Sequence, residues 1–311
     1  MDPLVVVLGP TGSGKTDLAL GISQIFDGEL VGCDSVQVYR HFDLGTAKTP
    51  PGGRRGIPHH LVDIADPAEN FTAGDYARLA RQALAEITAR GRLPVVAGGT
   101  GFYLRALLEG LFPGPQRDEV LRERLAGREQ NRPGFLHRLL RRMDAATASR
   151  IHPNDAQKLI RAVEVSMLRR QPMSEQFEAG RDRLTGYRVV KIGLAPPRAE
   201  LNRRLDGRLE RMFAGGLVEE VRSILGRGVP RTARPFESLG YKEALAVVDG
   251  RMSVEEAVAA AQQATHQYAK RQMTWFRRET EVHWIKGFGE DPEVRENAEQ
   301  VLKNALVRKH H

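Results

Sequence analysis

A glycine-rich stretch near the N-terminus constrains the fold of this chain more than any other feature. Residues Gly9–Thr16 read G-P-T-G-S-G-K-T, follow the apolar run Leu4–Leu8, and precede a helical pattern that begins near Asp17. The order of strand, G-x-x-x-x-G-K-[ST] loop and helix is typical of a phosphate-binding loop. Glycines allow the tight turn, and successive backbone N–H groups then point at an anion beside the helix N-terminus. The stretch therefore predicts a polyphosphate site.

Every residue of this loop is a candidate contact for the phosphates. The candidates are Gly9, Pro10, Thr11, Gly12, Ser13, Gly14, Lys15 and Thr16. Lys15 adds a full positive charge, and the hydroxyl of Thr16 is placed to hold Mg²⁺, which makes Mg²⁺ the predicted cofactor and Thr16 its predicted ligand. The loop by itself does not identify the polyphosphate as ATP.

Short apolar runs alternate with helical patterns over the first hundred residues, which predicts a parallel α/β sheet. Strands are expected at Leu4–Leu8, Glu29–Gly32 and Pro94–Ala97, with a helix over Phe71–Arg90. The polar, Gly/Pro-rich stretch Thr46–Pro58 is expected to be a mobile surface loop. The predicted fold class is a P-loop NTPase-like parallel sheet flanked by helices.

The middle of the chain lacks strand signals and is rich in arginine. Residues 116–186 show helical periods, and the strand pattern resumes at Tyr187–Leu194. The chain is therefore expected to divide into an α/β core, residues 1–115 and 187–311, and a helical insertion domain, residues 116–186. The last elements expected in the core are two helices and a strand: Arg198–Gly226, Ser253–Arg278 and Val282–Ile285.

Charge is concentrated in the insertion. The whole chain has 47 Lys and Arg against 39 Asp and Glu, a net charge of +8. Between Arg117 and Arg183, fourteen Arg and one Lys stand against four Asp and six Glu, a net of +5. Arginine suits phosphate contacts and stacking on bases, so a polyanionic partner is one interpretation. A solvated helical face explains the same charges equally well.

The cysteine content and the lengths of the apolar runs indicate the cellular compartment. A single cysteine, Cys33, excludes an internal disulfide and is typical of a reducing environment. The apolar runs are too short for a membrane-spanning helix, and the first strand leaves no room for a signal peptide. We expect a cytoplasmic protein without a membrane partner.

Three polar turns follow three predicted strands, so they should meet at one edge of a parallel sheet, where ligands bind. They are Gly9–Thr16, Cys33–Gln37 and Gly98–Gly101. Asp34 therefore lies about where a carboxylate faces the phosphate loop. Its role as a general base, a magnesium ligand or a helix N-cap stays open from the residues alone.

One expected feature of nucleotide hydrolases is missing. Their phosphate loop works with an apolar strand that ends in Asp and helps to hold Mg²⁺. Here the strand Pro94–Ala97 runs into Gly-Gly-Thr, and His60–Asp63 is a short substitute at best. This absence weakens the interpretation as an ATPase and leaves room for a reaction in which a diphosphate is the leaving group.

A set of motifs resembles the tRNA dimethylallyltransferase family over about residues 3–285. Besides the phosphate loop, the matching segments are Asp34–Arg40, Gly45–Lys48, Pro58–Asp63, Gly98–Gly101, His152–Asp155 with Gln157 and Arg161, Gly240–Glu243 and Tyr268–Arg277. The resemblance implies transfer of a dimethylallyl group from dimethylallyl diphosphate to N6 of the adenosine beside the anticodon, at position 37, in tRNAs that read codons starting with U. Tyr268, Trp275 and Phe276 fall on or near an apolar helical stripe and are expected in the core.

The resemblance also implies roles for individual residues. Asp34 would accept the N6 proton, Thr100 would line the channel, and Lys15 with Arg208 would neutralise the departing diphosphate. An alternative for Arg208 is an ion pair with Asp206 or Glu210 on its own helix. The residues that resemble tRNA contacts of the family are Asp34, Ser35, Val36, Gln37, Thr100, Arg122, Gln157, Lys158, Leu159, Ile160, Arg161, Glu237, Ser238, Leu239, Gly240, Tyr241 and Lys242.

Three alternatives to this function are open at this stage. A P-loop kinase acting on a small molecule would consume ATP. A prenyltransferase acting on a free adenine nucleotide would have no use for a large basic insertion. A nucleotide-switched RNA-binding protein would keep its function without Asp34. The expected partners of the prenyltransferase are the anticodon stem-loop of tRNA and dimethylallyl diphosphate, and the expected working form is a monomer.

Overall fold

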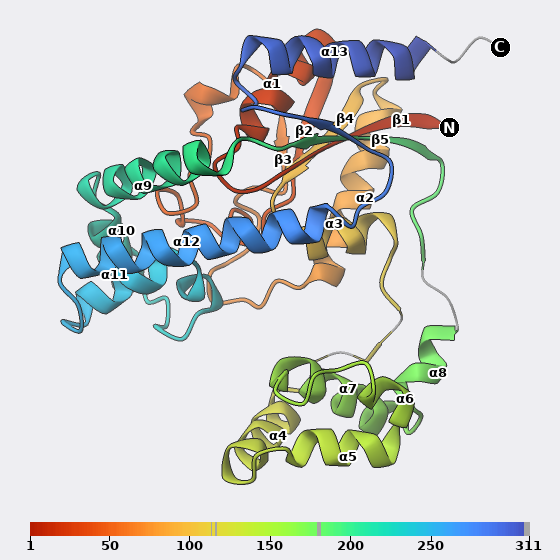
Figure 1. The fold of residues 1–311 in the computed structure, drawn as a ribbon, viewed down its shortest axis with the longest axis vertical. Coiled ribbons are helices and arrows are strands. Elements are labelled where there is room, and N and C mark those ends of the chain that lie inside the picture. The colour runs from red at the N-terminus through yellow and green to blue at the C-terminus, as the bar shows by residue number, and fades with distance from the viewer. Residues whose placement is uncertain (113, 116, 179–181, 308–311) are drawn as a thin grey trace. The chain divides into compact units, whose positions relative to one another are not determined.

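The computed structural model describes residues 1–112, 114–115, 117–178 and 182–307 (Figure 1). The predicted domain boundary at Gln116 lies outside these residues. The chain divides into two compact units. The core unit comprises Met1–Leu108 and Leu184–His311, and the insertion unit comprises Glu109–Arg183. Sequence patterns placed the boundaries slightly later, at 115/116 and 186/187.

The core unit is built on a six-stranded sheet of order β3-β2-β4-β1-β5-β6 in which every pair is parallel. The strands are β1 (Asp2–Leu8), β2 (Gly28–Gly32), β3 (His59–His60), β4 (Leu93–Gly98), β5 (Tyr187–Leu194) and β6 (Val282–Ile285). The five strands expected from the sequence are confirmed. In β1, Leu4–Leu8 have at most 1% of their surface exposed, as expected for a strand covered on both faces.

Helices cover both faces of the sheet, which confirms the predicted α/β class (Figure 1). On one face, α1 (Lys15–Ile25) and α13 (Pro292–Val307) pack through Leu18, Ile22 and Leu302. The helices α2 (Ala73–Ala89) and α3 (Gly101–Leu108) cover the other face. The hydroxyl of Thr72 and the carboxylate of Asp75 form a capping box at the start of α2.

A layer of helices follows β5 in the chain. It contains α9 (Arg198–Ala214), α10 (Leu217–Gly226), the 3₁₀ turn η2 (Arg234–Glu237), α11 (Tyr241–Val248) and α12 (Val254–Phe276). The prediction of one helix over Arg198–Gly226 was wrong. Gly216 takes a φ of +99° between α9 and α10, a conformation in which glycine avoids the steric cost of a Cβ, and the helix ends there.

The insertion unit consists of helices around a small core of its own. The helices are α4 (Glu119–Asn131), α5 (Phe135–Met143), α6 (Ala145–Ala148), α7 (Ala156–Arg169) and α8 (Met173–Glu178). Leu125, Leu136, Leu140 and Leu159 are buried together in that core. Across the described part of both units, no helix is apolar over a length sufficient to cross a bilayer.

Candidate active site

The loops that follow β1, β2 and β4 meet at one edge of the sheet, as expected for neighbouring parallel strands. The loops after β2 and β4 approach so closely that a Cβ on Gly98 would lie 2.0 Å from the Cys33 carbonyl oxygen. The Thr100 N–H donates to that oxygen at 3.2 Å, and the Thr100 Oγ1 accepts from the Ser35 N–H at 3.1 Å. Thr100 therefore fixes the turn that carries Asp34.

Asp34 uses one carboxylate oxygen for structure. Its Oδ1 accepts from the backbone N–H groups of Val36 at 2.9 Å and Gln37 at 3.2 Å. No helix begins at Asp34, so it is not a helix N-cap; these bonds close a turn and orient the carboxylate through Oδ1. No hydrogen bond from a described residue engages Oδ2, so this oxygen can accept a proton from a ligand.

Lys15 lies on the inner side of the phosphate loop. Its Nζ donates to the Pro10 carbonyl oxygen at 2.7 Å, which places the ammonium within the turn. Burial lowers the pKa of Lys15 to about 8, although the neighbouring Asp34 carboxylate raises it. The Arg208 guanidinium contributes to the lowering, so two cations and one carboxylate share a small volume.

Gln272 joins the phosphate loop to the loop after β4, a role that no sequence pattern predicted. Its Oε1 accepts from the Thr11 N–H and its Nε2 donates to the Gly99 carbonyl oxygen, both at 2.8 Å. A Cβ on Gly99 would lie 2.4 Å from that Nε2. The signal available was a glutamine on the buried stripe of a helix, since Gln272 is 6% exposed.

Arg208 projects from α9 without a carboxylate partner. Burial lowers its pKa, and the Asp34 carboxylate opposes that effect. The alternative pairing on its own helix is not seen. Asp206 pairs with His266 at 2.7 Å, and the Glu210 carboxylate accepts from Gln262 at 3.2 Å. Since no described residue accepts a hydrogen bond from Arg208, its guanidinium is available to an anion.

Asp34 and Arg208 line one cavity of about 370 Å³, the active-site cavity. Lys15 and Gln272 are not among its lining residues, and neither is Thr100, which the sequence comparison had expected there. Its polar lining includes Thr11, Asp34 and Arg208, and its apolar lining includes Leu205, Leu209 and Met212 from successive turns of α9. The remaining lining residues are Ser35, Val36, Gly45, Thr46, Glu237, Ser238, Leu239, Thr265, Tyr268 and Arg271. Tyr268, expected in the core, instead faces this space, and burial raises the pKa of its hydroxyl to about 12. Such a lining fits a ligand with an anionic head and an apolar tail.

Comparison with known proteins identifies the family. The model of a family described as IPP transferase matches residues 37–279. The chain belongs to the IPP transferase family. A tRNA dimethylallyltransferase of Solibacter usitatus is 60% identical over 95% of this chain and 96% of its own length. Another of Koribacter versatilis is 55% identical over 98% of this chain and 99% of its own length.

A solved structure extends the similarity to three dimensions. The full-length tRNA isopentenylpyrophosphate transferase of Bacillus halodurans is 33% identical, covers 100% of both chains and superposes with a TM-score of 0.72. Sequence and fold therefore agree on the IPP transferase assignment over nearly the whole chain.

Several residues expected to contact tRNA lie in or beside the active-site cavity of this IPP transferase. Ser35, Val36, Glu237, Ser238 and Leu239 line the cavity. Gln37 lies beside it, where its Nε2 donates to the Thr46 carbonyl oxygen at 3.0 Å. Lys242 is exposed on α11, and Gly240 is buried at the start of that helix.

The structure corrects the interpretation of Tyr241. This side chain is fully buried, its hydroxyl donates to the Glu220 carboxylate and accepts from the Gly45 N–H at 3.1 Å, and its ring packs on Phe42 at 4.7 Å. A Cβ on Gly45 would lie 2.4 Å from that ring. Tyr241 therefore holds the Gly45 turn and presents no side-chain surface to RNA.

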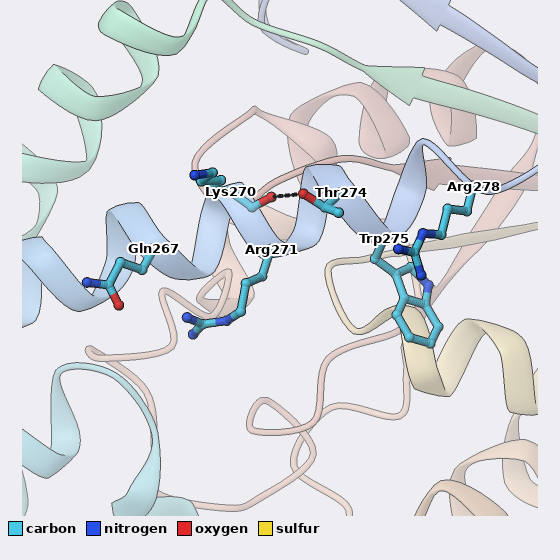
Figure 2. Close-up of a pocket in the computed structure, with 6 residues that line it drawn as sticks. All are labelled: Gln267, Lys270, Arg271, Thr274, Trp275 and Arg278. Carbon is cyan, nitrogen blue, oxygen red and sulfur yellow. Dashed lines mark hydrogen bonds between the residues drawn. The ribbon is translucent and has the colours of Figure 1, made fainter. Parts of the chain in front are cut away.

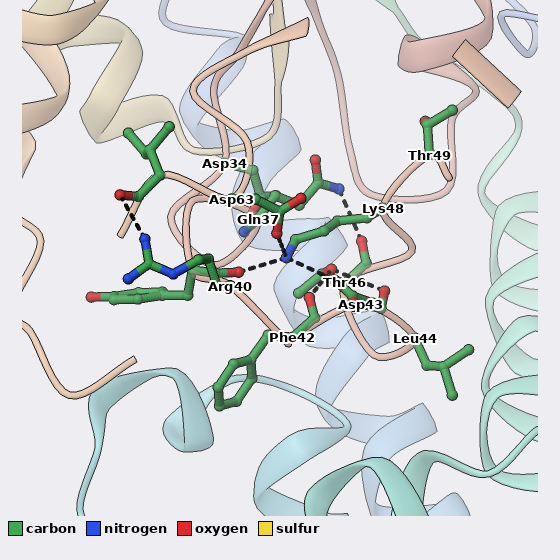
Figure 3. A network of polar contacts seen from close by, with 12 residues as sticks. Asp34, Gln37, Arg40, Phe42, Asp43, Leu44, Thr46, Lys48, Thr49 and Asp63 are labelled. Atoms are coloured by element: carbon green, nitrogen blue, oxygen red, sulfur yellow. Dashed lines mark hydrogen bonds and ion pairs between the residues drawn. The ribbon is translucent and has the colours of Figure 1, made fainter. Parts of the chain in front are cut away.

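Lys48 ties the same segment to Asp63, in the turn that follows β3 (Figure 3). Its ammonium, on a side chain only 5% exposed, donates to the Tyr39 carbonyl at 2.5 Å and to the carboxylates of Asp43 at 2.9 Å and Asp63 at 2.6 Å. The predicted surface loop begins with this anchor, and most of Pro50–Pro58, which includes the short 3₁₀ turn Pro51–Arg54, is exposed. These bonds hold the chain on both sides of Gly45 and Thr46, two residues that line the active-site cavity.

In the insertion unit, two predicted tRNA contacts hold a buried carboxylate. Arg122 forms two hydrogen bonds of 2.8 Å with Glu164, and Arg161 forms a third of 2.6 Å. Burial alone would raise the pKa of Glu164, but the two guanidinium groups lower it to about 2. These arginines thus have a structural partner that the sequence did not predict.

The other predicted tRNA contacts in this unit differ in how exposed their side chains are. Gln157 and Lys158 are exposed on the first turn of α7, where Lys158 also pairs with Asp155 at 2.6 Å. Ile160 is half-buried. Leu159 is fully buried in the core of the unit, so the structure corrects its interpretation: its side chain packs inside and is not offered to RNA.

Proposed function

We propose that this protein transfers a dimethylallyl group from dimethylallyl diphosphate to N6 of the adenosine beside the anticodon, position 37, in tRNAs that read codons starting with U. Membership of the IPP transferase family and the names of its relatives, which match nearly the full chain, support this reaction. The small-molecule kinase and the nucleotide-switched RNA-binding protein have no such support.

The observation that carries the proposal is the composition of the active-site cavity. A dimethylallyl diphosphate combines two phosphates with a small branched hydrocarbon. The cavity sets the phosphate loop at Thr11 and the cation of Arg208 beside the apolar stripe Leu205, Leu209 and Met212. Burying the tail on that stripe contributes favourable transfer free energy, and the cations compensate for the desolvation of the diphosphate.

The reaction uses the groups gathered around this cavity. The N6 nitrogen forms a bond to C1 of the donor as the C1–oxygen bond breaks, and the bonding pair leaves with the diphosphate. Lys15 and Arg208 neutralise the charge that develops on the leaving group. Asp34 accepts the proton that N6 loses, through the Oδ2 that carries no protein hydrogen bond. Thr100 acts by holding the Asp34 turn in place.

The loop also fits a magnesium ion carried by the diphosphate. The Thr16 hydroxyl, at the start of α1, has no hydrogen-bond partner among the described residues. Those residues also contain no cluster of three His, Cys, Asp or Glu side chains with metal-binding geometry. A site with one protein hydroxyl suits Mg²⁺, which is often bound mainly by substrate phosphates and water. When bound, the ion would neutralise part of the diphosphate charge.

Recognition of tRNA is proposed to involve both units. The acceptor adenine leaves its stack to reach the cavity, at a cost of a few kcal/mol that contacts to the extruded base recover. Exposed residues of the insertion unit, among them Arg124, Gln157 and Lys158, are proposed to contact the anticodon stem through its phosphates. The working form is proposed to be a cytoplasmic monomer.

A pair of tRNA transcripts tests the proposal. The protein is incubated with radiolabelled dimethylallyl diphosphate and a transcript that reads a U-starting codon, or the same transcript with guanosine in place of the adenosine beside the anticodon. We expect label in the first transcript alone. Label in both transcripts, or transfer to free AMP in a parallel reaction, would contradict the proposed acceptor.

A further inference from the structure

Side chains that do not line the active-site cavity hold two of its loops in place. The first is Trp275, expected in the core, which is half-buried and lines a groove on α12 together with Arg271 and Arg278 (Figure 2). A Cβ on Gly101 would lie 2.2 Å from the indole Nε1. Trp275 therefore packs against the start of α3, directly after Thr100.

The phosphate loop is supported by residues 287–291, which connect β6 to α13. The Gly289 N–H donates to the Ser13 carbonyl oxygen at 2.9 Å. The two segments approach so closely that a Cβ on Gly14 would lie 2.1 Å from the Glu290 Oε2. A Cβ on Gly289 would lie 2.1 Å from the Gly14 carbonyl oxygen. Residues 287–291 therefore fix the backbone of the phosphate loop directly before the start of α1.

The same segment also binds α9. The Glu290 carboxylate pairs with the Arg204 guanidinium through its Oε1, and the Arg204 Cζ lies 4.9 Å from the ring centroid of Phe288. The Phe288 ring packs with Leu205 of α9 in a small apolar cluster. Arg204 thus has two partners on the segment that supports the phosphate loop.

Arg204 lies one turn before Arg208 on α9, so the two side chains project from the same face of the helix. The positive charge of Arg204 contributes to the lowered pKa of Arg208, which lines the active-site cavity. By pairing with Arg204, the Glu290 carboxylate offsets this repulsion and holds the turn of α9 that carries Arg208. The Glu290 Oε2 is buried and accepts no hydrogen bond from a described residue, so Arg204 is the polar partner that orients the carboxylate.

We propose that Glu290 is a positioning residue for diphosphate binding, which joins the phosphate loop to α9 and so sets the place of Lys15 relative to Arg208. This inference rests on the proposed function, because it takes the ligand of these two cations to be a diphosphate. Glu290 does not line the active-site cavity and touches no reacting atom. It also lies outside residues 37–279, which the family model matches.

Calorimetric titration with inorganic diphosphate, in the absence of tRNA, tests this inference. Glu290→Ala removes the contact between the loop and α9, and we expect about tenfold weaker binding because the two cations are no longer held in place. Glu290→Gln can still accept a hydrogen bond from Arg204, so its loss should not exceed about threefold. Glu296→Gln removes an exposed carboxylate of α13 and is the matched control, expected within about twofold of the unsubstituted protein.

A double-mutant cycle shows whether Glu290 acts through Arg204. Arg204→Ala breaks the same ion pair, so the double variant should bind diphosphate no more weakly than the weaker of the two single variants. Affinity for a tRNA anticodon stem-loop should stay within about twofold in all of these variants, since a general loss of folding would weaken both ligands. A thermal melt of each variant without ligand accompanies the titrations.

Four results would overturn the inference. They are an unchanged diphosphate affinity in Glu290→Ala, an equal loss in Glu296→Gln, additive losses in the cycle, and a parallel loss of diphosphate and tRNA affinity. Tighter binding of diphosphate by Glu290→Ala would also contradict it, because the carboxylate would then merely repel anions. Failure of the proposed function is separate: the variants would then differ in diphosphate affinity as expected, yet the unsubstituted protein would transfer no prenyl group.

Discussion

At the scale of single residues, the site depends on cations held close together by the fold. Lys15 donates to its own loop at Pro10, and Arg208 has no carboxylate partner although it is largely removed from water. Such an arrangement is costly without an anion, because each cation loses hydration and repels the other. A bound diphosphate would remove that cost, so the site suits an anionic leaving group.

The lowered pKa of Lys15 predicts a pH dependence with a definite sign. Its pKa is about 8 in the folded protein and near 10.5 without burial, so the ammonium deprotonates as the pH rises through about 8. We expect kcat/KM to fall above pH 8, because the neutral amine cannot neutralise the diphosphate. Folding stability should rise over the same range, since the folded protein disfavours the charged form that persists in the unfolded chain up to pH 10.5.

A pH–rate profile with a parallel thermal melt at each pH checks this prediction. Lys15→Arg is the matched variant, because its guanidinium stays protonated throughout, and its lower activity should be flat above pH 8. A basic limb that persists in Lys15→Arg would assign the limb to another group. Loss of stability above pH 8 would contradict the linkage argument.

Some single residues of the site could be predicted from the sequence and others could not. The phosphate loop and the Asp34 turn were predictable because their residue types and spacing follow from local backbone geometry. Gln272 was not, because its two hydrogen bonds join loops far away in the chain and depend on how α12 packs. Tyr241 and Leu159 were expected to contact tRNA because they lie in motifs of the family, but both side chains are buried. A motif indicates that a residue is important and does not indicate whether its side chain faces solvent or the core.

At the scale of elements, α4 and α7 in the insertion unit are joined by Arg122 and the buried Glu164, which also pairs with Arg161 of its own helix. From the sequence, the arginines of this unit fitted either contacts with a polyanion or a solvated helical face, and Arg122 and Arg161 resembled tRNA contacts. In the structure, Arg122 forms an ion pair with Glu164, whereas neighbouring arginines such as Arg124 are exposed. No pattern of charges in the sequence shows which carboxylate will be buried.

A pair of substitutions on α4 is predicted to separate structure from RNA binding. Arg122→Ala leaves a buried carboxylate with one partner fewer, and we expect a loss of about 3 kcal/mol in the stability of the insertion unit. Arg124→Ala, two residues away and exposed, should change stability little and should weaken binding of tRNA. Thermal unfolding of the full chain and tRNA titrations measure both quantities.

The stability of these two variants at low pH provides a control. The pKa of Glu164 is depressed to about 2 in the folded protein, so its contribution is present above pH 4.5 and is lost as the pH falls towards 2. The stability difference between Arg122→Ala and the unsubstituted protein should shrink over this window. A difference that is equal at pH 7 and pH 2, or a destabilised Arg124→Ala, would show that Glu164 is not the cause.

At the scale of the whole molecule, the order of elements gives the core unit its function. A parallel sheet places the loops after β1, β2 and β4 at one edge, and the helical layer after β5 adds Arg208 and the apolar stripe of α9. The sheet was predictable from alternating apolar and helical patterns. The cavity was not, because it depends on the break at Gly216 and on packing between helices that no local pattern encodes.

The central claim is that the phosphate loop holds the diphosphate of a prenyl donor and that the reaction releases it. The most direct test measures inorganic diphosphate and prenylated adenosine together, in one reaction of the protein with dimethylallyl diphosphate, tRNA and ATP. We predict that the two products appear in equal amounts while ATP is unchanged. Both should disappear together in Lys15→Ala. Consumption of ATP in step with the modified nucleoside, or diphosphate release without prenylated adenosine, would contradict the claim.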